Sequence, residues 1–254
     1  MASSNLTPFA HHEGMLEIPD FLSTVSSTKL EMVENNKEIL YYNTPAAFDL
    51  EASSFYDHEE KRACMYIWQF GLHGYVTYGR TWQDFTIFFK ILTDILHLDD
   101  SRRLVIYVHN LKYDWQWFRK RFEWDKVFIV DERQPIVARC GGLEFRDSLI
   151  LAGGVSLATV GKNLVKYPVQ KAVGDLDYEL VRTPITPLSP VELHYCEYDC
   201  RVLMSYIQEK IETDGDICNI PLTNTGYVRR ACRKACFPEV QDVQEYDGRI
   251  DSDC

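Results

Sequence analysis

The order of strand-like and helix-like segments constrains the fold of this chain more than any other feature of its sequence. Apolar runs on either side of Gly71-Leu72-His73-Gly74 predict a β-hairpin. Later strand candidates alternate with helix candidates. The predicted strands are residues 46–52, 63–70, 75–78, 104–108, 126–130 and 136–146, and helices are predicted at 112–124 and 156–164. Strands that first cluster as hairpins and then alternate with helices predict one α/β domain, with a mixed central sheet flanked by helices.

Two further helices begin with typical start residues. Thr81 is a good N-cap for a helix in which aromatic and aliphatic residues recur at helical spacing. Ser189-Pro190 supplies the preferred N-cap and first residue of a long helix that reaches about residue 211. A last helix is predicted at 226–236. The aromatic residues of the helix after Thr81 are therefore expected in the core.

Composition restricts the class of protein. The 254 residues are 46% hydrophobic and carry a formal net charge of −11. Such a chain buries enough apolar surface to fold, so disorder is excluded for most of it. The acidic balance disfavours a simple basic nucleic-acid coat, but it is compatible with binding phosphates through metal ions held by carboxylates.

Targeting and cysteine patterns give expectations about location. No run reaches the roughly 18 apolar residues of a membrane span, and the first 16 residues lack the pattern of a signal peptide. Eight cysteines without a secretion signal are expected to be reduced thiols, and no Cys-x-x-Cys or His-x(3–5)-His pair indicates zinc. We expect a cytoplasmic protein without membrane contact, in the host cytosol if the protein is viral.

The polarity and periodicity of the sequence divide the chain into three segments. Residues 1–40 are polar without sustained periodicity and are predicted to be a flexible or peripheral extension, in which His11-His12 is a solvated pair. Residues 41–213 form the predicted α/β domain. Residues 214–254 hold the last helix and an acidic tail.

Carboxylates cluster at three places. Asp49 and Glu51 alternate with Phe48 and Leu50 on a predicted strand, so both acids point to one face. Two adjacent carboxylates repel each other, and a divalent cation such as Mg²⁺ or Mn²⁺ would relieve the repulsion. A strand that simply emerges into solvent is the alternative explanation.

The second cluster lies where a predicted strand ends, and the third lies on one face of a predicted helix. His109-Asn110-Leu111-Lys112-Tyr113-Asp114 lies at a strand-to-helix junction, where α/β sheets commonly bind ligands; a plain turn followed by a helix-start acid is the alternative. Tyr195 and Asp199 are four residues apart in the long helix and share a face.

Together, Asp-x-Glu, Asn-Leu-x-Tyr-Asp and Tyr-x-x-x-Asp occur in the order of the three exonuclease motifs of the DEDD superfamily, tyrosine subclass. With Gly174-Asp175-Leu176-Asp177-Tyr178, residues 109–114 resemble the 3′–5′ exonuclease domain of protein-primed family B DNA polymerases, as found in phages, viruses and linear plasmids. The resemblance spans roughly residues 41–211. It implies a ribonuclease-H-like fold and a domain that hydrolyses single-stranded DNA 3′ ends to 5′-mononucleotides during proofreading.

The resemblance also implies roles for single residues. Two divalent ions, Mg²⁺ or Mn²⁺, would be held by Asp49, Glu51, Asp114 and Asp199, while Tyr195 orients the attacking water and Lys171 neutralises the phosphate; Lys166 is the alternative lysine. The implied DNA-binding residues are His109, Asn110, Leu111, Tyr113, Ser148, Leu149 and Tyr178, with Ser156-Leu157 as a second candidate for the Ser-Leu pair.

The chain departs from the family pattern at several positions. Ala52 occupies the place of the usual hydroxyl residue after the first-motif Glu, and Ser53 follows it. Val173 stands where the family usually has its catalytic lysine. The two palm motifs of such polymerases are not present in the 254 residues, so polymerase activity is not expected from this sequence. The expected partners are a single-stranded DNA 3′ end, a terminal (priming) protein and polymerising domains outside this sequence.

Two other functions remain open at the level of sequence. One is a stand-alone DEDD nuclease that trims DNA or RNA, and preference for ribo- or deoxyribo-oligonucleotides would distinguish it. The other is a non-catalytic domain that binds a replication partner, although the intact set of four acids and a tyrosine argues against it.

Overall fold

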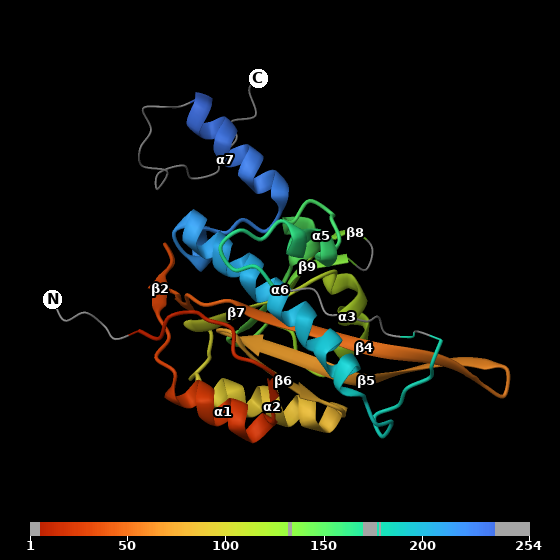
Figure 1. The fold of residues 1–254 in the computed structure, drawn as a ribbon. Coiled ribbons are helices and arrows are strands. Elements are labelled where there is room, and N and C mark those ends of the chain that lie inside the picture. Colours follow the sequence, from red (N-terminus) through yellow and green to blue (C-terminus); the bar gives the residue numbers. More distant parts are fainter. Residues whose placement is uncertain (1–5, 132–133, 170–176, 178, 237–254) are drawn as a thin grey trace.

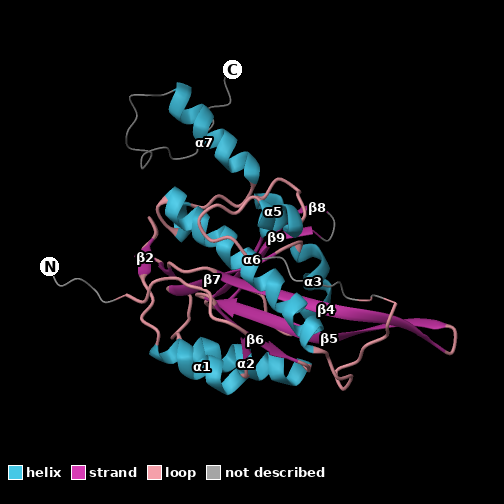
Figure 2. Cartoon of the chain, in the orientation of Figure 1, coloured by secondary structure: helices cyan, strands magenta, loops and turns pink. Residues whose placement is uncertain are grey.

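A mixed ten-stranded sheet with helices on both faces organises the computed structural model (Figures 1 and 2), which describes residues 6–131, 134–169, 177 and 179–236. The main path of the sheet runs β1-β6-β5-β4-β7-β10-β9-β8, and β3 joins it beside β7. The strands are β1 (Met15–Leu16), β2 (Met32–Glu34), β3 (Leu40–Tyr42), β4 (Ala46–Asp57), β5 (Glu60–Leu72), β6 (Tyr75–Gly79), β7 (Arg102–Val108), β8 (Lys126–Asp131), β9 (Gln134–Cys140) and β10 (Leu143–Asp147). The predicted mixed α/β class is confirmed.

Helices cover the two faces unequally. Helices α1 and α2 lie together on one face, while the long helix α6 crosses the other (Figure 1). The helices are α1 (Ile18–Ser27), α2 (Trp82–Ile95), α3 (Leu111–Phe118), α4 (Ser148–Leu151), α5 (Leu157–Lys162), α6 (Pro190–Asp214) and α7 (Asn224–Cys236), with a 3₁₀ turn at Ile217–Asn219. The Thr81 and Ser189 caps are both present as capping boxes.

Strand β4 is central because it pairs with β5 antiparallel and with β7 parallel. β7 in turn pairs with β10 in parallel register. The carboxyl end of β7 therefore lies beside the first residues of β4, where Phe48 pairs with Val108, and the carboxyl end of β10 lies on the other side of β7. This arrangement brings the first two carboxylate-bearing segments of the sequence together.

An aromatic cluster fills the space between the sheet and α2. Phe48 from β4 contacts the rings of Phe85 and Phe89 from α2, Phe118 from α3 and Phe145 from β10, with centroids 5.6–6.4 Å apart. These five side chains are at most 1% exposed. Rings at these separations gain edge-to-face attraction beyond the burial of their apolar area.

The described part of the N-terminal extension differs from the expectation of a flexible or peripheral arm. Helix α1 buries Phe21, Leu22 and Val25 in the aromatic side of the core, and β1 pairs with β6. His11 is half-buried, with Nε2 2.7 Å from Ser205 Oγ on α6, so the prediction of a solvated pair is wrong for His11. His12 is exposed, and its ring stacks on Tyr75 at 3.8 Å. Elements of two to ten residues give too short a hydrophobic pattern to be recognised.

Three predicted boundaries also differ. Helix α3 ends at Phe118 rather than 124. The predicted strand 136–146 is two antiparallel strands, because Gly141 adopts φ +54° and a Cβ on Gly142 would lie 2.5 Å from the Arg102 carbonyl. Helix α7 begins at Asn224, and the acidic tail 237–254 lies outside the described residues. Among the helices that the structure describes, none combines the length and apolar character needed to cross a membrane.

Truncation of Phe85 to Ala should lower the free energy of unfolding by about 3–5 kcal/mol, because the substitution removes a buried ring and leaves a cavity in the aromatic cluster. Chemical denaturation would measure the loss. Tyr56→Ala is the matched control, since Tyr56 is 76% exposed near the tip of the β4–β5 hairpin and should change stability by less than about 0.5 kcal/mol. Equal effects of the two substitutions would contradict the assignment of Phe85 to the core.

Candidate metal centre

Strand β4 presents Asp49 and Glu51 on the face that α6 covers. Phe48 and Leu50 are buried in the aromatic cluster at 0% and 2% exposure, so the alternation of the strand turns the two acids to the opposite face. The pairing register shifts immediately after Glu51, where β5 carries the extra residue Tyr66. The strand prediction for 46–52 is confirmed, and β4 continues to Asp57.

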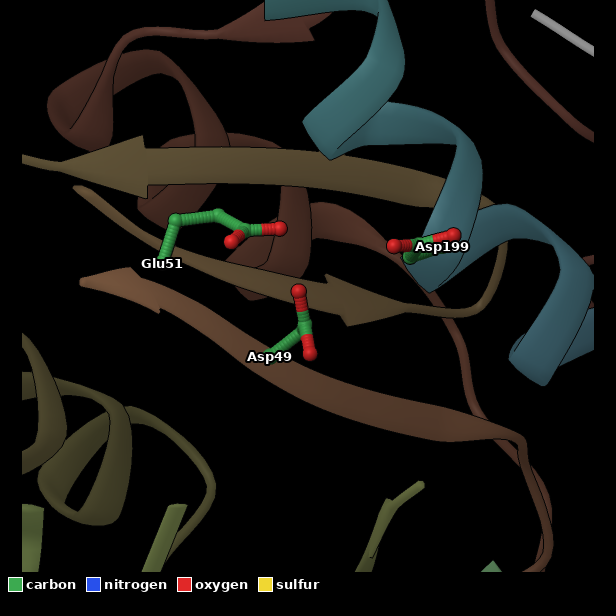
Figure 3. A group of neighbouring side chains, drawn as sticks. All are labelled: Asp49, Glu51 and Asp199. Atoms are coloured by element: carbon green, nitrogen blue, oxygen red, sulfur yellow. The ribbon is translucent and has the colours of Figure 1, made fainter. Parts of the chain in front are cut away.

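Helix α6 brings Asp199 to the same place. Cys200, Leu203 and Met204 pack on the sheet and fix the rotation of the helix. Oxygen atoms of Asp49, Glu51 and Asp199 all lie within 4.8 Å of one another, and Figure 3 shows the two strand acids and the helix acid facing a common space. Asp49 and Asp199 are 150 residues apart in the sequence, so only the fold creates this cluster.

Helix α3 supplies the fourth acid. Asn110 adopts a left-handed conformation with φ 72°, and the Leu111 N–H donates to Asp147 Oδ2 at 3.0 Å, which fixes the start of the helix. Asp114 then lies in the first turn at 2% exposure. The backbone N–H of Leu50 interacts with both Asp49 and Asp114, so the two carboxyls lie close to the same peptide group.

The carboxyl groups share an unusual electrostatic environment. Burial, followed by the charges of Asp114, Glu51 and Asp199, raises the pKa of Asp49 well above its ordinary value. Burial and the Asp199 charge raise the pKa of Glu51 to about 8, and burial raises the pKa of Asp199 to about 7. Burial and the Glu51 charge raise the pKa of Asp114. The site therefore binds protons readily when no other cation is present.

This donor set fits divalent metal ions. Within the described residues, Asp49 Oδ2 and Asp114 Oδ1 are buried and accept no hydrogen bond. Buried polar atoms without partners are rare in folded proteins and often mark a missing ion or water. Carboxylate oxygens are the ligands that Mg²⁺ and Mn²⁺ prefer. The cluster has the ligands and the excess of negative charge that such ions would balance.

Of the other implied catalytic residues, the structure places only Tyr195 near the carboxylate cluster within the described part of the chain. Tyr195 lies one helical turn before Asp199, half-buried against Tyr66 and Ile67. Lys171 lies outside the described residues. Lys166, the alternative, pairs with Glu212 on α6 at 2.8 Å, and Glu212 is 13 residues beyond Asp199, about 20 Å along the helix. Lys166 is therefore not at the carboxylate cluster.

The implied DNA-binding residues divide into buried and accessible groups. Ser148 and Leu111 are fully buried; the Ser148 hydroxyl lies 3.0 Å from His109 Nδ1 and donates to the Val108 carbonyl. These two side chains support the strand-to-helix junction from inside the fold. Asn110 and Tyr113 are exposed, and His109 and Leu149 are partly exposed. Tyr178 lies outside the described residues, and Ser156 is the N-cap of α5.

The structure explains why neither residue after Glu51 offers a free hydroxyl group. Ala52 packs against the aromatic cluster on the far face of β4. Ser53 returns to the face of Glu51, but it is buried and accepts a hydrogen bond from the Arg182 N–H at 3.0 Å. Sequence reasoning missed Arg182, whose charge acts on Glu51, because a single arginine in an irregular segment produces no periodic signal.

Fold and cluster together define a class: the chain is a mixed α/β protein, with a central sheet flanked by helices and an acidic centre between β4, α3 and α6. Among solved structures, phi29 DNA polymerase complexed with single-stranded DNA matches with a TM-score of 0.55 at 15% identity, over 76% of this chain and 35% of the polymerase. Its ternary complex with primer-template DNA and incoming nucleotides matches with a TM-score of 0.57 at 16% identity, over 77% and 35%.

These likenesses concern the fold. The chain spans about a third of the length of the polymerase it matches. The catalytic core of Rrp6 from Trypanosoma brucei aligns with a TM-score of 0.47 at 13% identity, over 85% of this chain and 53% of that one, a level at which a common fold does not follow. No protein-family model and no curated protein matches the sequence.

Replacement of Glu51 by Gln should stabilise the metal-free protein at high pH only. A carboxyl whose pKa rises on folding contributes its full stability below its unfolded value, 4.5 for Glu, and loses that contribution as the pH rises through about 8. In EDTA, Glu51→Gln should therefore raise the free energy of unfolding by about 1–3 kcal/mol at pH 8.5 and change it little at pH 4. Chemical denaturation at the two pH values would measure the difference. Glu60→Gln, on an exposed side chain, is the control, and a gain that is equal at both pH values would contradict the electrostatic explanation.

Proposed function

We propose that this chain is a metal-dependent 3′–5′ exonuclease that belongs to a protein-primed family B DNA polymerase and hydrolyses single-stranded DNA 3′ ends to 5′-mononucleotides. The convergence of Asp49, Glu51 and Asp199, with Asp114 beside them, carries the proposal. The likeness in fold to phi29 DNA polymerase, whose structures contain single-stranded and primer-template DNA, supports DNA as the substrate.

Each acid has a proposed role. Asp49, Glu51 and Asp199 would hold one ion, and Asp49 and Asp114 the second. Bound divalent ions would stabilise the negative charge that develops on the phosphoryl oxygens and the leaving 3′ oxygen. Asp49 is the natural shared ligand, because it lies between the other acids and its pKa responds to all three.

The remaining residues would bind and orient. Tyr195, one turn from Asp199, would hold the attacking water through its hydroxyl, and Lys171 would neutralise the phosphate. Asn110 and the exposed Tyr113 would bind the strand near its 3′ end, together with Tyr178, since base stacking on aromatic rings holds single strands without reading their sequence. A terminal protein and polymerising domains outside this sequence are the proposed partners, in DNA replication in the cytoplasm.

Replacement of either Asp49 or Glu51 by Ala should reduce mononucleotide release by about 10³-fold or more, because the cation would lose a ligand. Release of 5′-mononucleotides from a labelled oligo-dT with Mg²⁺ or Mn²⁺ is the measurement, and EDTA should abolish it. Glu60→Ala, an exposed carboxylate on the hairpin, is the matched control. Unchanged activity in the Asp49 and Glu51 variants would refute the metal-site assignment, and equal or faster cleavage of oligo-rU would favour an RNA-trimming enzyme.

Tyr195→Phe should lower kcat by about 10–100-fold and leave KM nearly unchanged, because the substitution removes only the hydroxyl proposed to orient water. Single-turnover assays at saturating oligonucleotide would separate the two constants. Tyr206→Phe, on the same helix but two turns beyond Asp199, is the control. A Tyr195→Phe enzyme with unchanged kcat would remove this residue from the proposed mechanism.

A further inference from the structure

Arg182 occupies a position unusual for a charged side chain. It is 3% exposed, and its guanidinium donates to Glu192 Oε1 at 2.7 Å and to the carbonyls of Asp177 and Leu180 at 2.6 and 3.1 Å. The second terminal nitrogen lies 2.6 Å from Glu192 Oε1. A buried arginine requires such partners, so this contact set fixes one geometry.

The same residue joins two of the three elements that supply the acidic centre, β4 and α6. The backbone N–H of Arg182 donates to Ser53 Oγ on β4. Ser53 lies two residues beyond Glu51 and on the same face of the strand. Glu192 belongs to the capping box of α6 and lies seven residues, about two turns, before Asp199. Arg182 therefore connects β4 to the start of α6 beside the carboxylates.

Arg182 also fixes the chain that precedes it. Its bonds to the Asp177 and Leu180 carbonyls fix the backbone at these two residues. Arg80 holds the chain that follows, with donations to the Thr183 and Thr186 carbonyls and to the carbonyl of Tyr66, the extra residue of the β5 bulge. Residues 179–186 are thus attached to the sheet at two points, Ser53 on β4 and Arg80 after β6.

We propose that Arg182 is a positioning residue for substrate binding: it holds residues 179–182 next to the strand that carries Glu51, so that this segment contacts the single-stranded 3′ end. The inference rests on the proposed exonuclease function and extends it to a residue outside the sequence motifs. Arg182 acts through the backbone it fixes, and it has no bond to the three clustered carboxylates among the described residues.

A lysine substitution tests the role because it keeps the charge but loses the planar fork that reaches several acceptors. Arg103→Lys is a matched control. Arg103 is also buried, donates to the Asp100 carbonyl and the Tyr41 hydroxyl, and lies 3.7 Å from Glu144, at the opposite end of β7 from the site.

Arg182→Lys should raise KM for oligo-dT about tenfold with kcat changed less than about threefold, whereas Arg103→Lys should leave both constants within about twofold. Fluorescence anisotropy of labelled oligo-dT on the inactive Asp49→Ala/Glu51→Ala protein should show the same tenfold rise in Kd when Arg182→Lys is added. Thermal unfolding of every variant checks folding. If Arg182→Lys does not fold, Glu192→Gln replaces it as the test, because Glu192 is the acidic partner of the Arg182 guanidinium. Glu192→Gln should raise KM about threefold.

Wild-type KM and Kd in Arg182→Lys, or an equal rise in Arg103→Lys, would overturn the positioning role. Failure of the proposed function is a separate result, since it would appear as a wild-type protein that releases no nucleotides with Mg²⁺ or Mn²⁺. In that case the Kd for oligo-dT, measured with and without Arg182→Lys, would still test the role of Arg182 in binding.

Discussion

Repulsion between buried carboxylates is the constraint on which this site depends. Burial raises the pKa of Asp49, Glu51, Asp114 and Asp199, and the charges of neighbouring acids raise it further for the first three. Such groups would separate if their backbones were free to move. They are held by packing on both sides of the sheet, with the aromatic cluster behind β4 and the apolar face of α6 in front.

The local half of this arrangement could be predicted from the sequence. The alternation of Phe48, Asp49, Leu50 and Glu51 defines two faces of a strand, and the spacing of Tyr195 and Asp199 defines one face of a helix, because both depend only on backbone geometry. The capping residues Thr81 and Ser189 mark helix starts for the same local reason. Resemblance to known motifs then suggested that these separate faces meet.

The remainder depends on tertiary contacts that no local pattern encodes. The burial of Ser148 and Leu111, which the resemblance implied to be DNA contacts, follows from how β10 and α3 meet at the end of β7. The packing of residues 6–40 depends on short elements that gain stability from the aromatic side of the core, the sheet edge and α6. Arg182 is significant only because Ser53, Glu192 and its own loop converge on it.

Gly71 on β5 lies beneath α6, close to the helical turn that carries Asp199. A Cβ at this position would lie 2.8 Å from Met204 Cε and 3.5 Å from Cys200 Cβ, the residue next to Asp199. The end of the Met204 side chain therefore fills the space that the missing side chain leaves, and α6 contacts β5 here through a flexible methionine. An alanine at this position would displace the end of the Met204 side chain. It would show whether the packing beneath α6 affects the ion site without affecting the stability of the fold.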